Sequence, residues 1–252
     1  MTRTVVITGG GTGIGRAVAA AFASDGAAVV ITGRRADVLD TAKAELGGDV
    51  RTVVCDSSDV EQVEALAASI TGQVDVLVNN AGGNRDLERG QGGLGAAMPA
   101  AKPSSLHALA QAWRANLESN LISAVITTAA LSERLATGGA VINIGSFAAD
   151  RGAGSYGAAK AGMASWNIGL ARELGARDIT ANVVVPGYIA DTEFFRGRMS
   201  DEFHAARVAE TMTKRAGCPD DIAGVVQFLA SPAARQITGQ VINVNGGALT
   251  TR

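Results

Sequence analysis

The stretch TVVITGGGTGIG, residues 4–15, decides the fold class of this chain. A short run of β-branched residues ends in a glycine-rich turn, and a helical pattern begins directly after it. Glycines at a strand end let the backbone approach a phosphate, and the following helix N-terminus supplies amide donors and a positive dipole end. The spacing does not match G-x-G-x-x-G, but Gly9, Gly13 and Gly15 fit a phosphate-cradling turn. A glycine-rich turn alone is weak evidence, and its position between the first strand and the first helix strengthens it.

The same rhythm of strand and helix continues outward from this turn. Seven short runs are rich in Val and Ile without alternation, which is typical of strands buried on both faces of a parallel sheet. They are residues 4–9, 27–33, 50–56, 74–80, 139–146, 179–187 and 239–247. Helical patterns lie between them at 14–25, 36–46, 59–71, 106–136, 155–176 and 219–230. The alternation predicts an α/β fold over residues 1–252, a single-domain, doubly wound, Rossmann-type sheet of seven parallel strands with helices on both faces.

The composition excludes several classes of protein. The 252 residues are 47% hydrophobic, with a formal net charge of −2 and no basic tract, so we expect neither a nucleic-acid partner nor an anionic membrane partner. Cys55, Cys218, His107 and His204 show no ligand-like spacing, so we expect no metal site. The N-terminus enters a strand pattern at once, and no apolar run is long enough to span a membrane. We therefore expect a cytoplasmic protein.

The end of the second strand, ITGRR at 31–35, bears on the cofactor. An acidic residue here would bind the ribose 2′-hydroxyl of NAD, but the chain has Gly33, Arg34 and Arg35. A guanidinium can hold a 2′-phosphate, so the pattern favours NADPH/NADP over NAD. The alternative is a solvated basic pair that begins a helix. At the end of the third strand, Asp56 would either accept from the adenine amino group or cap the next helix, and the sequence leaves both open.

The stretch GSYGAAKAG, residues 154–162, places Tyr156 and Lys160 one helical turn apart on a shared face. A surface pair on an Ala-rich helix is one interpretation. A phenol whose pKa is tuned by an ammonium group is the other. The pair alone does not decide between them.

Four motifs occur in a characteristic order. With TGGGTGIG at 8–15, NNAG at 79–82, SYGAAK at 155–160 and PGYIADT at 186–192, the chain resembles the short-chain dehydrogenase/reductase family. The resemblance covers essentially all 252 residues, including ITGQVINVNGG at 237–247. Each motif alone could arise by chance, but four at matching strand ends are specific.

The resemblance implies a catalytic set and a set of cofactor contacts. The catalytic set is Asn120, Ser146, Tyr156 and Lys160. The cofactor contacts are Gly9, Thr12, Gly13, Ile14, Gly15, Arg34, Arg35, Asp56, Asn80, Ala81, Gly82, Tyr156, Lys160, Pro186, Gly187, Ile189 and Thr192. Asn120 lies at the family's offset after Trp113, and Asn116 is the rival for its role. Asn79 is expected to support its strand instead of touching the cofactor.

The activity implied by the resemblance is interconversion of a ketone and a secondary alcohol by hydride transfer with NADPH. Tyr156 is expected to donate or accept the proton, with its pKa lowered by Lys160 and by the positive nicotinamide ring. Ser146 would stabilise the developing alkoxide, and Asn120 would hold a water behind Lys160. A small carbonyl or alcohol is the expected substrate and a homotetramer the expected assembly. A non-catalytic dinucleotide-binding regulatory protein, and an epimerase or dehydratase on the same fold, are the alternatives.

The chain departs from the family pattern in two places. Only nine residues separate Ser146 from Tyr156, fewer than usual, in the segment that shapes the substrate pocket. Residues 83–105 form an insertion that we expect to be a mobile lid over the substrate, with a subunit contact or a disordered loop as the alternative. The apolar side chains expected near the substrate are Phe147, Tyr188, Phe194, Phe195 and Met199. Asp150 and Arg151 could read a polar substituent, although solvated loop charges are the favoured interpretation.

Overall fold

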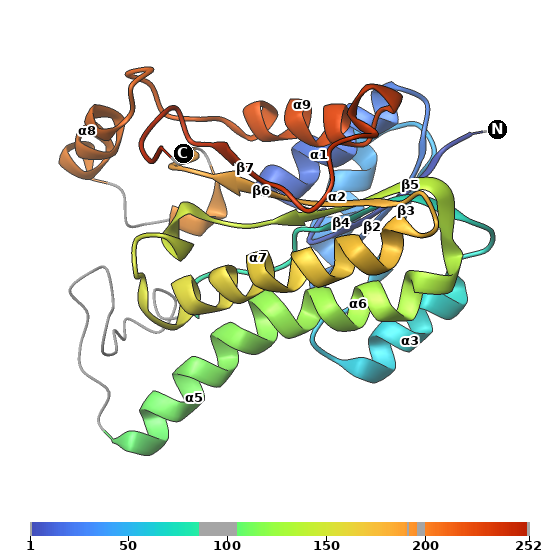
Figure 1. Cartoon of the computed structure of the whole chain (residues 1–252), viewed down its shortest axis with the longest axis horizontal. Helices are drawn as coiled ribbons and strands as arrows, with labels where there is room; N and C mark the ends of the chain where they lie inside the picture. Colours follow the sequence, from blue (N-terminus) through green and yellow to red (C-terminus); the bar gives the residue numbers. More distant parts are fainter. Residues whose placement is uncertain (1, 86–104, 191, 196–199, 251–252) are drawn as a thin grey trace.

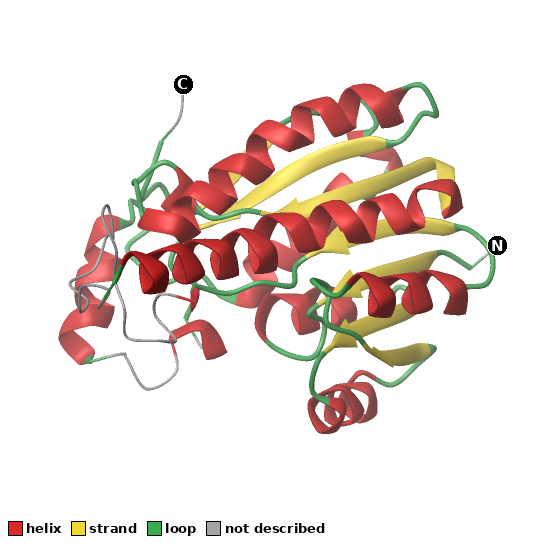
Figure 2. Ribbon diagram, turned by 90° about the horizontal axis from the view of Figure 1, so that it is seen from below, coloured by secondary structure: helices red, strands yellow, loops and turns green. Residues whose placement is uncertain are grey.

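The computed structural model describes residues 2–85, 105–190, 192–195 and 200–250, which form one seven-stranded parallel sheet with helices on both faces (Figure 1, Figure 2). The strand order is β3-β2-β1-β4-β5-β6-β7. The strands are β1 (Thr4–Thr8), β2 (Ala28–Gly33), β3 (Val50–Val54), β4 (Val74–Asn79), β5 (Leu135–Ile144), β6 (Thr180–Pro186) and β7 (Val241–Val244). The predicted doubly wound α/β fold is confirmed.

The helices divide into two layers. They are α1 (Gly13–Ser24), α2 (Ala36–Leu46), α3 (Val60–Ser69), α5 (Leu106–Leu117), α6 (Ser123–Leu131), α7 (Gly154–Gly175), α8 (Asp201–Glu210) and α9 (Pro219–Leu229). One layer contains α1, α2 and α9, and the opposite layer contains α3, α5, α6 and α7 (Figure 1). The helix α8 stands apart from both layers at the end of the sheet.

The two cores follow from the period-two geometry of the strands. Val5 and Ile7 of β1 pack with α1, α2 and α9, whereas Val6 between them packs with the α3, α6 and α7 side. Successive side chains of a strand point to opposite faces, so a strand covered on both faces needs an apolar residue at every position. This is why the strands are continuous apolar runs.

The strand order places the four sequence motifs together. The chain runs outward from β1 to β3 on one side and from β4 to β7 on the other, so the order reverses between β1 and β4. In open α/β sheets, ligands bind in the crevice beyond the carboxyl ends of the strands at such a switch point. The ends of β1, β4, β5 and β6 carry the glycine-rich turn, NNAG, Ser146 and PGYIADT respectively.

The prediction of one helix over 106–136 is wrong. A π-helical turn, Glu118–Ile122, separates α5 from α6, and the last residues of the range begin β5. The Asn120 side chain donates to the Asn116 carbonyl at 3.0 Å, and such a side-chain bond to a helical carbonyl competes with the regular backbone ladder. The sequence signal for the break is therefore the polar run at 118–120.

The helix α8 was not predicted, because none of its residues is buried and its apolar pattern is weak. A start signal was present in the sequence. Ser200 caps the helix by accepting from the Phe203 N–H at 3.1 Å, and Asp201 and Glu202 follow in the first turn. Short exposed helices of this kind are found from caps and not from periodicity.

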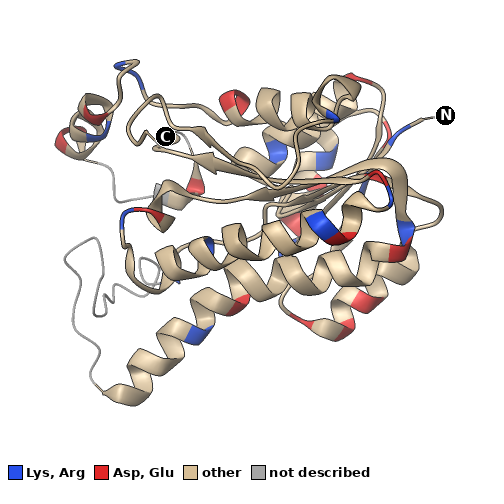
Figure 3. Cartoon of the chain, in the orientation of Figure 1, with Lys and Arg blue, Asp and Glu red and all other residues tan. Residues whose placement is uncertain are grey.

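No helix within the described ranges combines the length and the apolar character that a membrane crossing requires. The same residues contain no group of three or more His, Cys, Asp or Glu side chains arranged to hold a metal ion. Charged residues on α7 lie toward its ends, and its middle, residues 161–171, carries none (Figure 3).

Candidate active site

A cavity of about 1180 Å³ opens at the carboxyl ends of the strands. This volume exceeds the roughly 300–1,000 Å³ of a site for one drug-sized ligand, and is enough for a dinucleotide together with a second molecule. Every residue of the predicted catalytic and cofactor sets lines the cavity except Gly15. Asn116, the rival of Asn120, does not line it.

The glycine-rich turn connects β1 to α1. Gly9 has φ of +66°, and a Cβ at Gly15 would collide with the Gly9 carbonyl oxygen, so both positions require glycine. Gly15 therefore lies beneath the turn and acts through packing. The Thr12 side chain does not cap α1, and the first turn of α1 contains no acidic residue. A helix N-terminus with these features fits a pyrophosphate group.

Thr8 and Asn80 tie the glycine-rich turn to the NNAG segment. The Thr8 Oγ1 accepts from the N–H groups of Asn80 and Ala81, at 3.0 Å each. The Asn80 Nδ2 donates to the carbonyls of Thr8 and Gly9, also at 3.0 Å each. The side-chain amide of Asn80 thus braces the turn, and the contact that remains for a cofactor is through the backbone. Sequence reasoning missed Thr8, whose signal is its place at the end of the first strand opposite NNAG.

Asn79 has the supporting role that the sequence indicated. Its Nδ2 donates to Asn143 Oδ1 on β5 at 2.9 Å and to Thr128 Oγ1 on α6 at 2.8 Å. Asn143 in turn donates to Asn167 Oδ1 on α7 at 3.0 Å. These buried amides connect two strands and two helices beneath the cavity.

The nucleotide end of the cavity contains three charged residues from the predicted set. Arg35 pairs with Glu193, with 2.7 Å between Nη2 and Oε2, whereas Arg34 is exposed at the cavity wall. Asp56 accepts from the backbone and hydroxyl of Ser58, and burial works against its ionisation. The hydrogen bonds from Ser58 and the charge of Arg34 outweigh that burial and hold the pKa of Asp56 below its usual value.

The helix-capping alternative for Asp56 is wrong. The N-cap of α3 is Asp59, which accepts from the Gln62 N–H at 3.0 Å. Asp56 lies in the turn before the helix and faces the cavity. The adenine-contact interpretation therefore stays a prediction.

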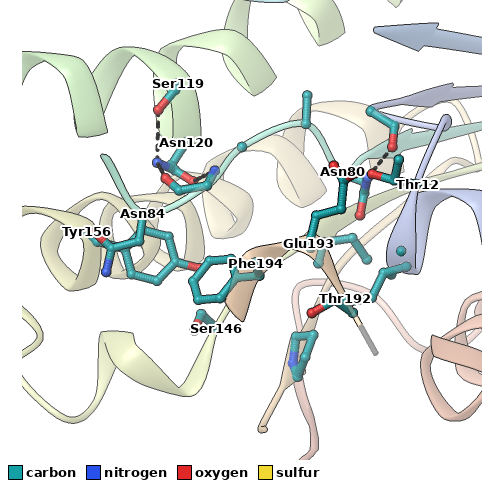
Figure 4. Close-up of a pocket in the computed structure, with 18 of the residues that line it drawn as sticks. Thr12, Asn80, Asn84, Ser119, Asn120, Ser146, Tyr156, Thr192, Glu193 and Phe194 are labelled. Carbon is teal, nitrogen blue, oxygen red and sulfur yellow. Dashed lines mark hydrogen bonds between the residues drawn. The ribbon is translucent and has the colours of Figure 1, made fainter. Parts of the chain in front are cut away.

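Ser146, Tyr156 and Lys160 line the other end of the cavity, and Figure 4 shows Ser146 and Tyr156 there. Tyr156 and Lys160 lie on the buried face of α7, with exposed fractions of 6% and 5%. The Lys160 Nζ donates to the Ile144 carbonyl at 2.7 Å and lies 5.9 Å from the centre of the Tyr156 ring. Ser146 follows β5 and its Oγ accepts from the Ala148 N–H at 3.2 Å, which leaves its own proton to donate.

Burial dominates the ionisation of Tyr156 and Lys160 in the protein without a cofactor. Burial raises the pKa of Tyr156 to about 12, against a lowering contribution from a hydrogen bond with Ser146. Burial lowers the pKa of Lys160 to about 8. In the protein alone, desolvation is the largest cause and sets the direction of both shifts. The expected lowering of the pKa of Tyr156 by Lys160 together with a positive nicotinamide ring stays a prediction. At neutral pH the phenol is a proton donor.

Asn120 occupies the π-helical turn and holds the end of the NNAG segment. Its Oδ1 accepts from the Gly83 N–H at 3.1 Å, and its Nδ2 donates to the Gly83 carbonyl at 2.9 Å. Asn116, one turn earlier, accepts from the Arg85 N–H and donates to Ser155 Oγ on α7. The side-chain amide of Asn120 therefore hydrogen-bonds to the backbone of Gly83. If Asn120 holds a water behind Lys160, as expected from the sequence, it would have to do so through a different atom.

The PGYIADT segment closes the cavity from the β6 side. The Thr192 Oγ1 donates to the Ile189 carbonyl at 3.2 Å, and a Cβ on Gly13 would lie 3.6 Å from the Thr192 side chain. Thr192 thus faces the glycine-rich turn across the cavity. The Phe194 ring packs on the Tyr156 ring, with centroids 5.8 Å apart, and separates Tyr156 from Thr192 in the view of Figure 4.

The substrate end of the cavity is lined by aromatic and basic side chains. Of the expected residues, Phe147, Tyr188 and Phe194 line it. Met199 and the side chain of Phe195 lie outside the described residues. Residues 86–104, which make up most of the predicted lid at 83–105, also lie outside them. Arg151, Phe203 and Arg207 also line the cavity. Sequence reasoning missed Phe203 and Arg207, because it did not predict the helix α8 that carries them.

Comparison with known proteins places this geometry among related chains. A family model described as enoyl-(acyl carrier protein) reductase matches residues 9–249. An uncharacterized oxidoreductase of Methylorubrum extorquens is 35% identical over 257 residues, which cover 97% of each chain. The 3-oxoacyl-[acyl-carrier-protein] reductase FabG of Escherichia coli K12 is 34% identical over 253 residues, covering 96% of this chain and 95% of that protein.

Solved structures agree in fold over almost the whole chain. A short-chain dehydrogenase/reductase from Brucella melitensis has a TM-score of 0.84 and 31% identity, covering 99% of this chain and 97% of that one. A blue fluorescent protein from a metagenomic library, in complex with NADPH, has a TM-score of 0.81 and 34% identity, covering 98% of each chain.

Proposed function

The chain belongs to the short-chain dehydrogenase/reductase family and is an oxidoreductase of that family. On this basis we propose that it interconverts a ketone and a secondary alcohol with NADPH as its cofactor. Tyr156 serves as the proton donor in reduction and the acceptor in oxidation. The proposal includes a small-molecule carbonyl or alcohol substrate, a cytoplasmic location and a homotetrameric assembly.

The observation that carries the proposal is the convergence of Ser146, Tyr156 and Lys160 on one wall of the cavity. Two hydroxyl donors and one buried ammonium meet where the carboxyl ends of β4 and β5 face α7. A developing alkoxide needs such donors, placed in advance and shielded from water. A non-catalytic dinucleotide-binding regulator would not need this combination, which argues against that alternative.

The residues of the nucleotide end fit a phosphorylated dinucleotide. The uncapped first turn of α1 would receive the pyrophosphate, and Arg34 would pair with a 2′-phosphate. The backbones of Ala81 and Gly82, with Ile189 and Thr192 opposite, would enclose the nicotinamide end. The neighbouring fluorescent protein, which binds NADPH, supports the same choice of cofactor.

When bound, NADPH supplies the hydride, which no side chain can. Ser146 donates a hydrogen bond to the substrate carbonyl oxygen, and Tyr156 gives that oxygen its proton as the alkoxide forms. Lys160 keeps a positive charge beside the phenol and stabilises the phenolate left behind. Asn120 fixes Gly83, so the NNAG backbone keeps its place at the cavity wall.

Two other reactions are weaker candidates. An epimerase or dehydratase acting on a sugar nucleotide would need room for a second nucleotide, and the described residues form a single sheet without a second domain for it. The matched family model is described by enoyl reduction. The paired hydroxyls of Ser146 and Tyr156 favour an oxygen that gains a proton, as in reduction of a carbonyl group.

The proposal is tested by following NADPH absorbance with a panel of aliphatic and aromatic ketones, and NADP reduction with the matching secondary alcohols. An enoyl thioester serves as the comparison substrate. We expect turnover of ketones and alcohols and little turnover of the enoyl thioester. Turnover of the enoyl thioester alone, or NADPH binding without turnover of any substrate, would contradict the proposal.

A further inference from the structure

Two arginines at the substrate end of the cavity have no part in the proposed hydride and proton transfer. Arg151 lies between β5 and α7, and Arg207 lies on α8. Both line the cavity. We propose that they form a site for a carboxylate on the substrate, so that the preferred substrates are keto acids and the corresponding hydroxy acids. This inference rests on the proposed function and specifies its substrate class.

The two guanidinium groups are held together by one carboxylate. The Arg151 Nη1 lies 2.9 Å from Glu210 Oε2, and the Arg207 Nη2 lies 2.6 Å from Glu210 Oε1. Glu210 does not line the cavity, so it bridges the arginines from behind. Two positive charges against one negative charge leave the cavity wall positive. The sequence favoured a solvated loop charge for Arg151. In the structure Arg151 lines the cavity, and we therefore assign it to the proposed site.

Each guanidinium also stacks over an aromatic ring. The Arg151 Cζ lies 4.5 Å from the centre of the Phe147 ring, and the Arg207 Cζ lies 5.4 Å from the centre of the Phe203 ring. The Arg151 Nη2 donates to the Ala248 carbonyl at 2.9 Å as well. These contacts fix both planar groups before any ligand arrives, so less side-chain entropy is lost on binding.

Arg207 has a donor that the protein does not use. Its Nε is buried and has no hydrogen-bond partner among the described residues. A buried donor without an acceptor is costly, and a hydrogen bond to a charged acceptor is stronger than one to a neutral acceptor. A carboxylate oxygen beside Arg207 would satisfy this donor and offset the unpaired charge. The side chains of Arg151, Arg207 and Glu210 are only 30–31% exposed, so screening by solvent is reduced.

This anion site is separate from the nucleotide end. Arg34 and Arg35 follow β2, where Arg35 pairs with Glu193 from the segment after β6. Arg151 lies with Phe147 between β5 and α7, and Arg207 lies with Phe203 on α8. The cofactor phosphates would bind at the nucleotide end. An anion bound by Arg151 and Arg207 would therefore belong to the substrate. The apolar part of that substrate would contact the aromatic rings between its carboxylate and the Tyr156 phenol.

The test compares each acid with its own methyl ester. The probes are benzoylformate, 3-benzoylpropionate and 4-benzoylbutyrate, whose carboxylates lie at increasing distance from the ketone, together with their methyl esters. The wild type, Arg207→Gln, Arg207→Lys and Glu210→Gln are assayed with NADPH. The quantity compared is the ratio of kcat/KM for the acid to that for the ester.

We expect the wild type to prefer at least one acid over its ester by about tenfold or more. Arg207→Gln should bring the ratio of kcat/KM for the acid to that for the ester down to about one, because it removes the guanidinium that the carboxylate binds. Arg207→Lys should keep part of the preference. Glu210→Gln should keep or increase it, because it removes the competing carboxylate and leaves both arginines.

Two results would overturn the inference. Turnover of esters with no acid preferred shows that the arginines only hold α8, while the proposed function stands. Equal loss of activity toward acid and ester in Arg207→Gln and Glu210→Gln shows the same structural role. Failure to reduce any ketone, acid or ester, contradicts the proposed function itself, and the two failures are therefore distinguishable.

Discussion

Arg35 and Glu193 form an ion pair, 2.7 Å from Nη2 to Oε2, that joins the end of β2 to the segment after β6 across the nucleotide end of the cavity. The side chains are 52% and 32% exposed, so the pair contributes at most about 1 kcal/mol to stability. Its consequence concerns binding. Glu193 occupies Arg35, and Arg34 is left as the principal partner for a 2′-phosphate.

The first prediction follows from this division. Arg34→Gln should lower kcat/KM for NADPH by about tenfold or more, because a charge-assisted hydrogen bond is lost, and should leave kcat/KM for NADH nearly unchanged. Glu193→Gln should raise the affinity for NADPH a few-fold by releasing Arg35. Steady-state kinetics with both cofactors measure the two effects. Equal preference for NADPH and NADH in the wild type would show that these arginines are only a solvated helix start.

The second prediction concerns pH and stability. The pKa of Lys160 is about 8 in the folded chain and 10.5 as a model value, so between these values the unfolded chain binds more protons. The free energy of unfolding should therefore rise with pH from about 8 to about 10.5, as the cost of burying the ammonium disappears. Tyr156, with a pKa raised from 10 to about 12, acts in the opposite direction above pH 10.

Urea denaturation of the wild type and Lys160→Met across this window tests the prediction. The stability advantage of Lys160→Met over the wild type should be largest near neutral pH and should shrink toward pH 10.5. A difference between the two proteins that does not vary with pH would mean that the ammonium of Lys160 is well solvated in the folded state.

The third prediction separates the two asparagines of the π-helical region. Asn120→Ala leaves the N–H and carbonyl of Gly83 without their partner, which should cost on the order of 2 kcal/mol and also raise KM for NADPH. Asn116→Ala removes contacts to Arg85 and Ser155, and should lower stability with KM for NADPH near that of the wild type. Urea denaturation measures the stability of both variants, and kinetics at varied NADPH concentration measure their KM for the cofactor. The opposite assignment of the KM effect would make Asn116 the functional residue.

How far the sequence predicted the molecule depends on the range of the interactions. The strands were found because a strand buried on both faces is apolar throughout, and the motifs were found because they directly follow strand ends. The pairing of Arg35 with Glu193, 158 positions away, leaves no local pattern. The pKa of Tyr156 depends on burial under the whole fold, and α8 buries none of its residues, so neither followed from spacing.

The fourth prediction concerns assembly. The outer face of α7 exposes Ala158, Ala161 and Ile168, the last by 53%, and Ile122 of the π-helical turn is 43% exposed. A helix that is apolar on its outer face as well as its inner face suits contact with a second subunit. In contrast, Leu170 of the same helix is buried in the chain's own core.

We therefore expect a homotetramer in sedimentation equilibrium and smaller species for Ile168→Glu. The control is Val60→Glu on α3, where an apolar side chain is 52% exposed outside this surface, and its assembly should be unchanged. A wild-type monomer at micromolar concentration would refute the proposed assembly.

The account's central claim, that Tyr156 transfers the proton in an NADPH-dependent carbonyl reaction, is tested most directly by Tyr156→Phe. Two quantities are measured for the wild type and the variant. One is kcat for a ketone that the wild type reduces, and the other is the dissociation constant of NADPH from fluorescence titration. The predicted result is a kcat lower by about 10²–10⁴-fold with NADPH affinity nearly unchanged, because only the proton donor is removed. A variant that retains most of its kcat would contradict the claim.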